Sequence, residues 1–354
     1  MYGFLAVFER ASLNLQRTFG VLGLAALALQ PSLPSSAQTP EEFYSGKVVS
    51  LYIGYPAGGG YDVYGRVVAH HFGKHIPGHP TVIPVNMEGA GSLRLTNWLF
   101  NAAPRDGTAL GIVNHGVPFE PLLGNKEFAQ FDPMKFTWIG SANNETVVCV
   151  AWHSSGVSGF HDLAGREFII GGTGPGADDF VFPKLLSGVL GAHLRFVTGY
   201  AGGNDINFAM ERGEVEGRCG WTWSSVKSTR QYWLDDGSIN VFLQLGMARH
   251  PDLPDTPLIL DFAQTEDQQK ILRLIMARTI LGRPFLAPPD LPETRALALQ
   301  TAFDSTMQDP EFLAEAAQVH LEIMPIQSAA MVEILREAFA TPPDLVEQAR
   351  ELLR

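Results

Sequence analysis

The segment Tyr55–Arg66 (YPAGGGYDVYGR) holds three consecutive glycines between a strand-like run and a helix-like run. Glycine lets a backbone take φ values that other residues avoid, so this loop can approach a ligand closely. Free N–H groups of the first helical turn, together with the helix dipole, favour a negative charge there. Asp62 is expected to be the helix N-cap, and Arg66 is either a fixed countercharge or a surface ion-pair partner. Neither G-x-G-x-x-G nor G-x-x-x-x-G-K-[ST] fits, which disfavours a nucleotide site; a purely structural turn is the alternative.

A second glycine-rich segment, Gly171–Asp179 (GGTGPGADD), repeats the order of strand, loop and helix. The two helix N-termini would then face each other across a cleft and hold one anion from both sides. Thr173 would add a hydroxyl donor. We expect Asp178 and Asp179 to cap the helix; in the alternative, one of them meets an amino group or a hydroxyl of the ligand.

Two aromatic residues and a histidine cluster are the other candidates for chemistry. Trp221 and Tyr200 would either line the cleft or pack in the core. The histidines lie in one short stretch, HHFGKHIPGH, which starts at His70. No cysteine or carboxylate completes a metal set at regular spacing, so the sequence predicts a solvated helix end, no metal and no cofactor. No G-x-S-x-G is present, so no catalytic residue is assigned.

The first 37 residues are typical of a secretory signal peptide. Arg10 and Arg17 precede the apolar run Phe19–Leu29, and small residues lead to an expected cleavage site after Ala37. Export to the periplasm is therefore expected. Without this segment the 25 basic and 37 acidic residues become 23 and 36, a net charge of −13. That charge argues against nucleic acid as a partner, and any anion site must be built from local dipoles and a few fixed cations.

Short β-type runs alternate with amphipathic helical runs, which favours a parallel α/β architecture. The expected strands are 48–55, 81–86, 109–114, 146–152, 167–171, 194–197, 215–220, 239–245 and 279–287. The expected helices are 62–74, 92–102, 179–190, 205–212, 292–307, 311–318, 328–339 and 345–353. We predict two lobes: 38–142 and 247–354 form the first, 143–246 the second. Cys149 and Cys219 either form a disulfide or are buried free thiols.

An ordered series of motifs resembles the Bug-type receptors, the solute-binding proteins of tripartite tricarboxylate transporters. It includes P-A-G-G-G-x-D with an early arginine, V-N-x-E-G-A-G at Val85–Gly91 and A-P-R-D-G-T at Ala103–Thr108. It continues through Phe131–Pro133, Gly172–Gly176, Gly199–Gly202 and Gly213–Gly217 to Pro284–Pro288. The motifs span nearly all of the chain after residue 37. The sequence departs from the family pattern at Tyr61, Asp178 and Asp179.

The resemblance implies a two-lobed type II periplasmic-binding-protein fold of the α/β class, with a hinge and an interlobe cleft. It implies that the protein binds a small organic anion, typically a mono- or dicarboxylate, and delivers it to the membrane permease subunits of the transporter. We expect the protein to be a monomer. With the residues discussed above, the predicted ligand-binding set is Ala57, Gly58, Gly59, Gly60, Tyr61, Asp62, Asn86, Gly89, Thr173, Gly174, Gly176, Ala177, Asp178, Tyr200 and Trp221. An exported enzyme acting on a small acid and a sensory receptor of the same fold are the alternatives.

Overall fold

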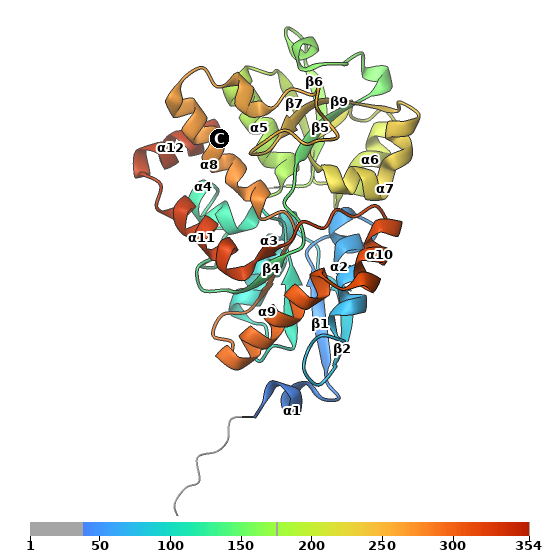
Figure 1. Ribbon diagram of the computed structural model, residues 1–354. Coiled ribbons are helices and arrows are strands. Elements are labelled where there is room, and N and C mark those ends of the chain that lie inside the picture. The colour runs from blue at the N-terminus through green and yellow to red at the C-terminus, as the bar shows by residue number, and fades with distance from the viewer. Residues whose placement is uncertain (1–37, 175, 354) are drawn as a thin grey trace, which may run out of the picture. The chain divides into compact units, whose positions relative to one another are not determined.

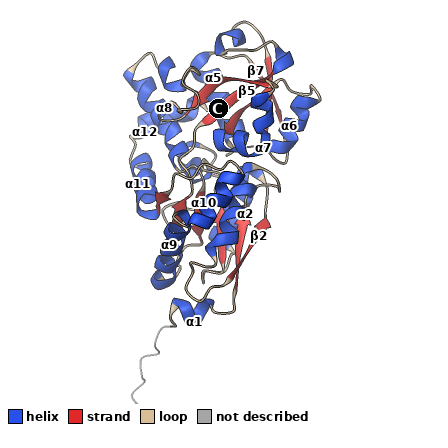
Figure 2. Ribbon diagram, turned by 45° about the vertical axis from the view of Figure 1, so that its right-hand side comes forward, coloured by secondary structure: helices blue, strands red, loops and turns tan. Residues whose placement is uncertain are grey.

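The computed structural model describes residues 38–174 and 176–353, where two mixed β-sheets are flanked by helices (Figures 1 and 2). The predicted signal peptide lies outside the described residues. The first sheet has the strand order β11 (Ile326–Gln327), β4 (Thr137–Ser141), β10 (Pro284–Ala287), β3 (Ala109–Ile112), β1 (Val48–Ile53) and β2 (Thr81–Asn86). The second has the order β7 (Leu194–Thr198), β6 (Phe168–Gly172), β8 (Gly217–Thr222), β5 (Val147–Trp152) and β9 (Ile239–Leu245).

The prediction of parallel sheets is correct only for the βα units. β1 pairs in parallel with β2 and β3, and β6 with β7 and β8. β5 is antiparallel to β8 and β9, and β10 is antiparallel to β3 and β4. The antiparallel strands lie where the chain changes sheets, between β4 and β5 and again between β9 and β10. The predicted lobe boundaries remain a prediction.

The helices follow the predicted pattern with some omissions. Among those that the structure describes are α1 (Pro40–Tyr44), α2 (Gly60–Phe72), α3 (Leu93–Asn101), α4 (Glu120–Leu123), α5 (Asp178–Leu190), α6 (Gly203–Glu211), α7 (Trp223–Asp235), α8 (Glu266–Ile280), α9 (Glu293–Met307), α10 (Pro310–Gln318), α11 (Ser328–Phe339) and α12 (Pro343–Leu352). The sequence reasoning missed α1, α4, α7, α8, β4 and β11. It also read 279–287 as one strand, whereas α8 runs to Ile280 and β10 begins only at Pro284. No described helix is long and apolar enough to cross a membrane.

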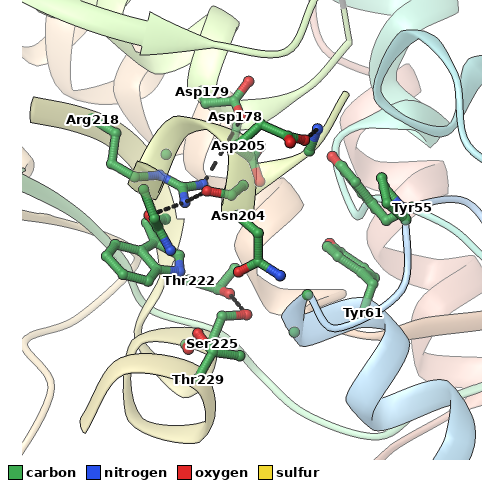
Figure 3. A pocket seen from close by; sticks show the side chains of 18 of the residues that line it. Tyr55, Tyr61, Asp178, Asp179, Asn204, Asp205, Arg218, Thr222, Ser225 and Thr229 are labelled. Atoms are coloured by element: carbon green, nitrogen blue, oxygen red, sulfur yellow. Dashed lines mark hydrogen bonds and ion pairs between the residues drawn. The ribbon is translucent and has the colours of Figure 1, made fainter. Parts of the chain in front are cut away.

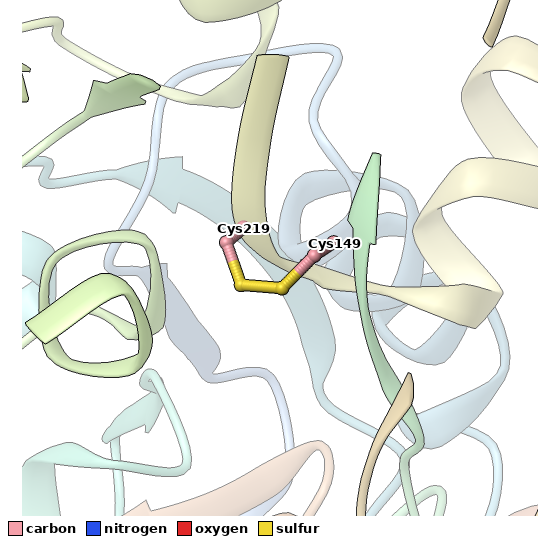
Figure 4. The surroundings of a disulfide bond; sticks show 2 residues. All are labelled: Cys149 and Cys219. Atoms are coloured by element: carbon pink, nitrogen blue, oxygen red, sulfur yellow. A yellow bond between two sulfur atoms is a disulfide. The ribbon is translucent and has the colours of Figure 1, made fainter. Parts of the chain in front are cut away.

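The second sheet contains a buried interior strand, β5, and a disulfide that links it to β8. Val147–Ala151 are fully buried, as expected of a strand covered on both faces. Cys149 lies directly opposite Cys219 in the β5–β8 register, and the two form a disulfide (Figure 4). Of the two possibilities that the sequence left open, the structure therefore has the bridge.

Candidate functional site

A cavity of about 270 Å³ lies where loops and helix starts of the two sheets meet (Figure 3). The first sheet supplies the loop after β1, the start of α2 and Asn114 beyond β3. The second sheet supplies the starts of α5, α6 and α7 and the end of β8. The lining residues are Tyr55, Pro56, Ala57, Gly59, Gly60, Tyr61, Asn114, Asp178, Asp179, Gly202, Gly203, Asn204, Asp205, Asn207, Phe208, Arg218, Gly220, Trp221, Thr222, Ser225 and Thr229.

The glycine loop after β1 is braced from behind by a polar network. Asp62 accepts hydrogen bonds of 2.8 Å from the Gly58 N–H, Arg66 Nε and Asn86 Nδ2. Burial acts to raise the pKa of Asp62, but these three donors outweigh it, so the pKa lies below its usual value. Asp62 is thus not the N-cap of α2, which is Gly59, and Arg66 is an ion-pair partner behind the loop rather than a countercharge in the cavity.

Because no described side chain caps α2, its first N–H groups are left for a ligand or water. The lining residues from the first sheet form one side of the cavity, the first wall, and those from the second sheet form the other, the second wall. Gly60 starts α2 at the point where these two walls meet. A Cβ at Gly60 would lie 1.7 Å from Ser225 Oγ, so the close approach requires glycine there. At Gly59 the nearest atom to such a Cβ is the Pro56 carbonyl oxygen at 3.8 Å. The steric requirement therefore falls on Gly60.

Two stacked tyrosines form the rest of the first wall. The Tyr55 and Tyr61 rings lie 4.8 Å apart with an interplanar angle of 18°. Asn114 Nδ2 donates to Tyr55 Oη at 3.1 Å, and the His115 N–H donates to Tyr61 Oη at 3.2 Å. Burial raises the pKa of both phenols, so both stay neutral at physiological pH. This wall offers flat apolar surface and backbone donors without a charged side chain.

The second wall is formed by helix starts. α5 begins directly after its N-cap Ala177, α6 after Gly202 and α7 after Thr222; among the described residues, the N-cap side chains of α5 and α7 make no capping hydrogen bond. The side chain of Asp205 accepts from the Gly202 N–H at 3.0 Å. Helix N-termini carry partial positive charge, so their convergence makes this side of the cavity favourable for an anion.

Arg218 on β8 is the cation of the cavity. Its Nη1 donates to the Gly203 carbonyl oxygen at 2.9 Å and to Asn207 Oδ1 at 3.0 Å, and its guanidinium lies 4.5 Å from the Trp221 ring centroid. Nη2 lies 4.0 Å from Asp179 Oδ2. Burial lowers the pKa of Arg218 to about 10, which still leaves the side chain protonated at neutral pH. The residue is 5 % exposed, so its charge is held rigidly.

The carboxylates of Asp178 and Asp179 also face this cavity, as Figure 3 shows. Asp179 Oδ1 accepts from the N–H of Thr173 at 2.9 Å and from its hydroxyl at 2.8 Å. Burial raises the pKa of Asp179 to about 6, although Arg218 acts to lower it. Asp178 Oδ2 lies 2.7 Å from His115 Nε2. The expectation that both residues cap α5 was wrong: they are its first two residues, and Asp179 instead holds the loop before it.

Part of the predicted set lines the cavity and part supports it. The residues that line it are Ala57, Gly59, Gly60, Tyr61, Asp178 and Trp221. The lining does not include Gly58, Asp62, Asn86, Gly89, Thr173, Gly174, Gly176, Ala177 or Tyr200. Gly58, Asp62, Asn86 and Thr173 belong to the bracing networks just described. Gly89 begins the turn in which Gly91 packs against Ala177, and Gly176 borders a separate groove. A ligand-binding role for the lining residues stays a prediction.

Sequence reasoning missed Arg218, the start of α6 and the hydroxyl residues Thr222 and Ser225 around the start of α7. The available signal for Arg218 was a charged residue inside the otherwise uncharged run Gly217–Trp221. The hydroxyls have a separate neighbour: Arg283 Nη2 lies 2.6 Å from Thr222 Oγ1 and 2.8 Å from both Ser224 Oγ and Ser225 Oγ. An arginine cannot take a proton from a hydroxyl. Ser224 Oγ also donates to Glu145 Oε1, but only Thr222 and Ser225 of these three residues line the cavity.

Comparison with known proteins identifies the fold. No family model matches the chain, and no curated protein matches it. The structure of the periplasmic binding protein BugD aligns with a TM-score of 0.70 at 18 % identity, over 87 % of this chain and 98 % of that one. The R. palustris protein Rpa4515 with adipate gives 0.67 at 17 % identity, over 86 % and 97 %. MatC (Rpa3494) from Rhodopseudomonas palustris with bound malate gives 0.66 at 16 % identity, over 87 % and 99 %.

The chain therefore has the fold of Bug- and TctC-type periplasmic binding proteins, and the predicted α/β periplasmic-binding-protein fold is confirmed. These neighbours are binding proteins rather than enzymes.

Proposed function

We propose that this protein is an extracytoplasmic solute-binding receptor that captures a small organic anion and delivers it to the permease subunits of a tripartite tricarboxylate-type transporter. The observation that carries the proposal is the cavity between the two sheets, where the starts of α2, α5, α6 and α7 converge beside the buried cation Arg218. Adipate and malate in two neighbours of the same fold support an organic anion as the ligand.

Export is part of the proposal. The sequence of residues 1–37 is typical of a signal peptide. The Cys149–Cys219 disulfide supports an oxidising compartment, because structural disulfides are rare in reducing ones. The periplasm is therefore the proposed location.

Within the class of small organic anions we propose a monocarboxylate with a flat apolar body, and the lining of the cavity supports this choice. The rings of Tyr55, Tyr61, Phe208 and Trp221 offer flat surface. The lining holds the guanidinium of Arg218 and the carboxylates of Asp178, Asp179 and Asp205, and behind the lining Arg278 Nη1 lies 3.9 Å from Asp178 Oδ1. Carboxylates at close range in a cavity repel a further negative charge. One ligand carboxylate can lie at Arg218 and the helix starts, whereas a second would face these side chains.

A thermal-shift screen of the mature protein tests both parts of this proposal. Because a ligand stabilises by RT ln(1 + [L]/Kd), a bound compound raises the melting temperature. We expect benzoate to raise it clearly, and adipate and malate to raise it little. If only the dicarboxylates raise the melting temperature, the proposal of a flat monocarboxylate ligand is wrong, but the proposal of an anion receptor holds. If only benzylamine or glucose acts, the anion receptor itself is wrong.

An exported enzyme is the second candidate, and it would require a base within reach of a nucleophile in the cavity. The cavity hydroxyls of Thr222 and Ser225 face Arg283. His115 contacts Asp178 on one ring nitrogen, and on the other it lies 3.2 Å from the Gly282 carbonyl oxygen. This arrangement favours binding over catalysis.

A further inference from the structure

Two adjacent histidines at the end of α2 converge on one carboxylate of α10. His70 Nδ1 and His71 Nε2 each lie 2.7 Å from the same oxygen, Oε2 of Glu315. The two imidazole rings lie 4.7 Å apart, and the three candidate ligand atoms all lie within 4.8 Å of one another. The sequence offered no carboxylate near the histidines, and the fold supplies one from far along the chain.

This donor set matches the preferences of zinc. Zn²⁺ takes imidazole nitrogens at about 2.0–2.1 Å and carboxylate oxygens at about 2.0–2.2 Å, and sites with two histidines and one glutamate leave a fourth position for water. A neutral imidazole can present either an N–H or a lone pair at a given nitrogen. His71 is nearly buried while His70 is exposed, so the site is anchored on one side and open to solvent on the other.

The charges around the site favour a dication. Lys74 Nζ lies 2.5 Å from Asp309 Oδ2 and 2.6 Å from Glu311 Oε2. With neutral histidines, one lysine and the three carboxylates of Asp309, Glu311 and Glu315 leave a local charge of −2. Within the described part of the chain, Glu315 has no lysine or arginine within ion-pair distance.

A second cluster of similar composition shows the contrast. His250, Asp252 and Glu322 also bring three such atoms together. Here Lys227 Nζ lies 2.7 Å from Asp252 Oδ2 and also contacts Glu322 Oε1. An ammonium group therefore holds the place that a metal would take, and this cluster serves as the internal control.

We propose that His70, His71 and Glu315 form a Zn²⁺ site that ties the end of α2 to α10. The opposite end of α2 carries the glycine loop of the cavity, so the metal would stabilise the helix that positions this loop. The inference rests on the α2–α10 contacts alone and stands or falls separately from the proposed receptor function.

The test is calorimetric titration of ZnCl₂ into the mature, metal-stripped protein without a polyhistidine tag. We expect one zinc per chain, an affinity weakened at least tenfold in both His71→Ala and Glu315→Gln, and an unchanged affinity in His250→Ala and in the exposed His161→Ala. Zinc should also raise the melting temperature of the wild type and not that of Glu315→Gln, whose far-ultraviolet circular dichroism should match the wild type.

Three outcomes would overturn the site. These are no binding to the wild type, undiminished affinity in both His71→Ala and Glu315→Gln, or an equal loss in His161→Ala or His250→Ala, which would mean adventitious binding to surface histidines. Because Glu315→Gln keeps the size and polarity of the side chain, a folding defect in His71→Ala alone would not obscure the result.

Discussion

The two walls of the cavity differ in what they contribute. The wall from the first sheet presents the stacked Tyr55 and Tyr61 rings and the backbone of Ala57–Gly60, while its charged residues Asp62 and Arg66 are paired behind the loop. The wall from the second sheet presents the charged side chains, Arg218 and the aspartates of α5 and α6. Figure 3 shows this division, with the tyrosines on one side and Arg218 on the other.

The apolar contact surface and the charged groups of this cavity therefore come from different parts of the fold and can be changed independently. Substitutions in the first wall should alter fit and closure, whereas substitutions in the second should alter the electrostatic part of binding. The two sides also differ in the pKa of their carboxylates. Hydrogen-bond donors lower the pKa of Asp62, whereas burial raises the pKa of Asp179.

The largest effect is expected at Arg218. Charge-assisted hydrogen bonds contribute about 1.5–3 kcal/mol each, so Arg218→Met should weaken binding of the best carboxylate about 100-fold by calorimetry. Arg212→Met is the matched control, since Arg212 is exposed and pairs only with Glu214 among the described side chains; it should bind like the wild type. An Arg218→Met affinity within threefold of the wild type would mean that the charge of the second wall does not act on the ligand.

Asp179 should show its effect in the pH dependence of stability. The folded pKa of about 6 lies above the ordinary value of 3.8, so the folded state binds the proton more tightly than the unfolded state. The unfavourable contribution of the ionised Asp179 carboxylate to the free energy of folding is therefore absent below about pH 4 and complete above about pH 6. The pKa difference of about two units corresponds to about 3 kcal/mol.

Asp179→Asn should remove this penalty, so that its free energy of unfolding gains on the wild type by up to about 3 kcal/mol between pH 4 and pH 6.5. Urea denaturation at a series of pH values measures the difference. Curves that stay parallel over this range would show that Asp179 keeps its ordinary pKa.

Gly60 tests the contact between the walls. A methyl group there would overlap Ser225 Oγ, so Gly60→Ala should lower the free energy of unfolding by about 1–3 kcal/mol, as overpacking does. Gly59→Ala, next to it in the loop, has space and should lose less than about 0.5 kcal/mol in the same denaturation experiment. Equal losses of unfolding free energy in the two variants would show that Gly60 is not the residue in close contact with Ser225.

The smallest effect is expected at Asp62. Its pKa is lowered in the folded state, so its contribution is present above the ordinary pKa and is lost as pH falls through the folded value. Asp62→Asn should therefore destabilise by about 1 kcal/mol at pH 7, and the loss should shrink in acid. This slope is opposite to that of Asp179; slopes of the same sign would contradict the contrast between the walls.

The first wall was predictable from the sequence because it is local. Strand, glycine loop and helix follow one another within Tyr55–Arg66, and turn chemistry depends on neighbouring residues. Even so, the sequence could not show which glycine meets the opposite wall, since the Gly60–Ser225 contact joins distant parts of the chain. Asp62 fitted a cap by residue type, yet the helix began two residues earlier and turned the carboxylate toward Gly58.

The second wall was predictable only in outline. Gly171–Asp179 was identified because it repeats the local pattern, but Arg218 reaches Asn207 and Asp179 through the packing of β8 against α5 and α6. Such contacts depend on strand order, which a single sequence does not specify. The pairing of Cys149 with Cys219 and of His71 with Glu315 was hidden for the same reason.

The most direct test of the division between walls is a crystal structure of the mature protein with its best-binding carboxylate. The ligand carboxylate should lie within hydrogen-bond distance of the Arg218 guanidinium and of backbone N–H groups at a helix start, with its apolar body against Tyr55 or Tyr61. A carboxylate held only by the first wall, or lying outside this cavity, would contradict this division between the two walls.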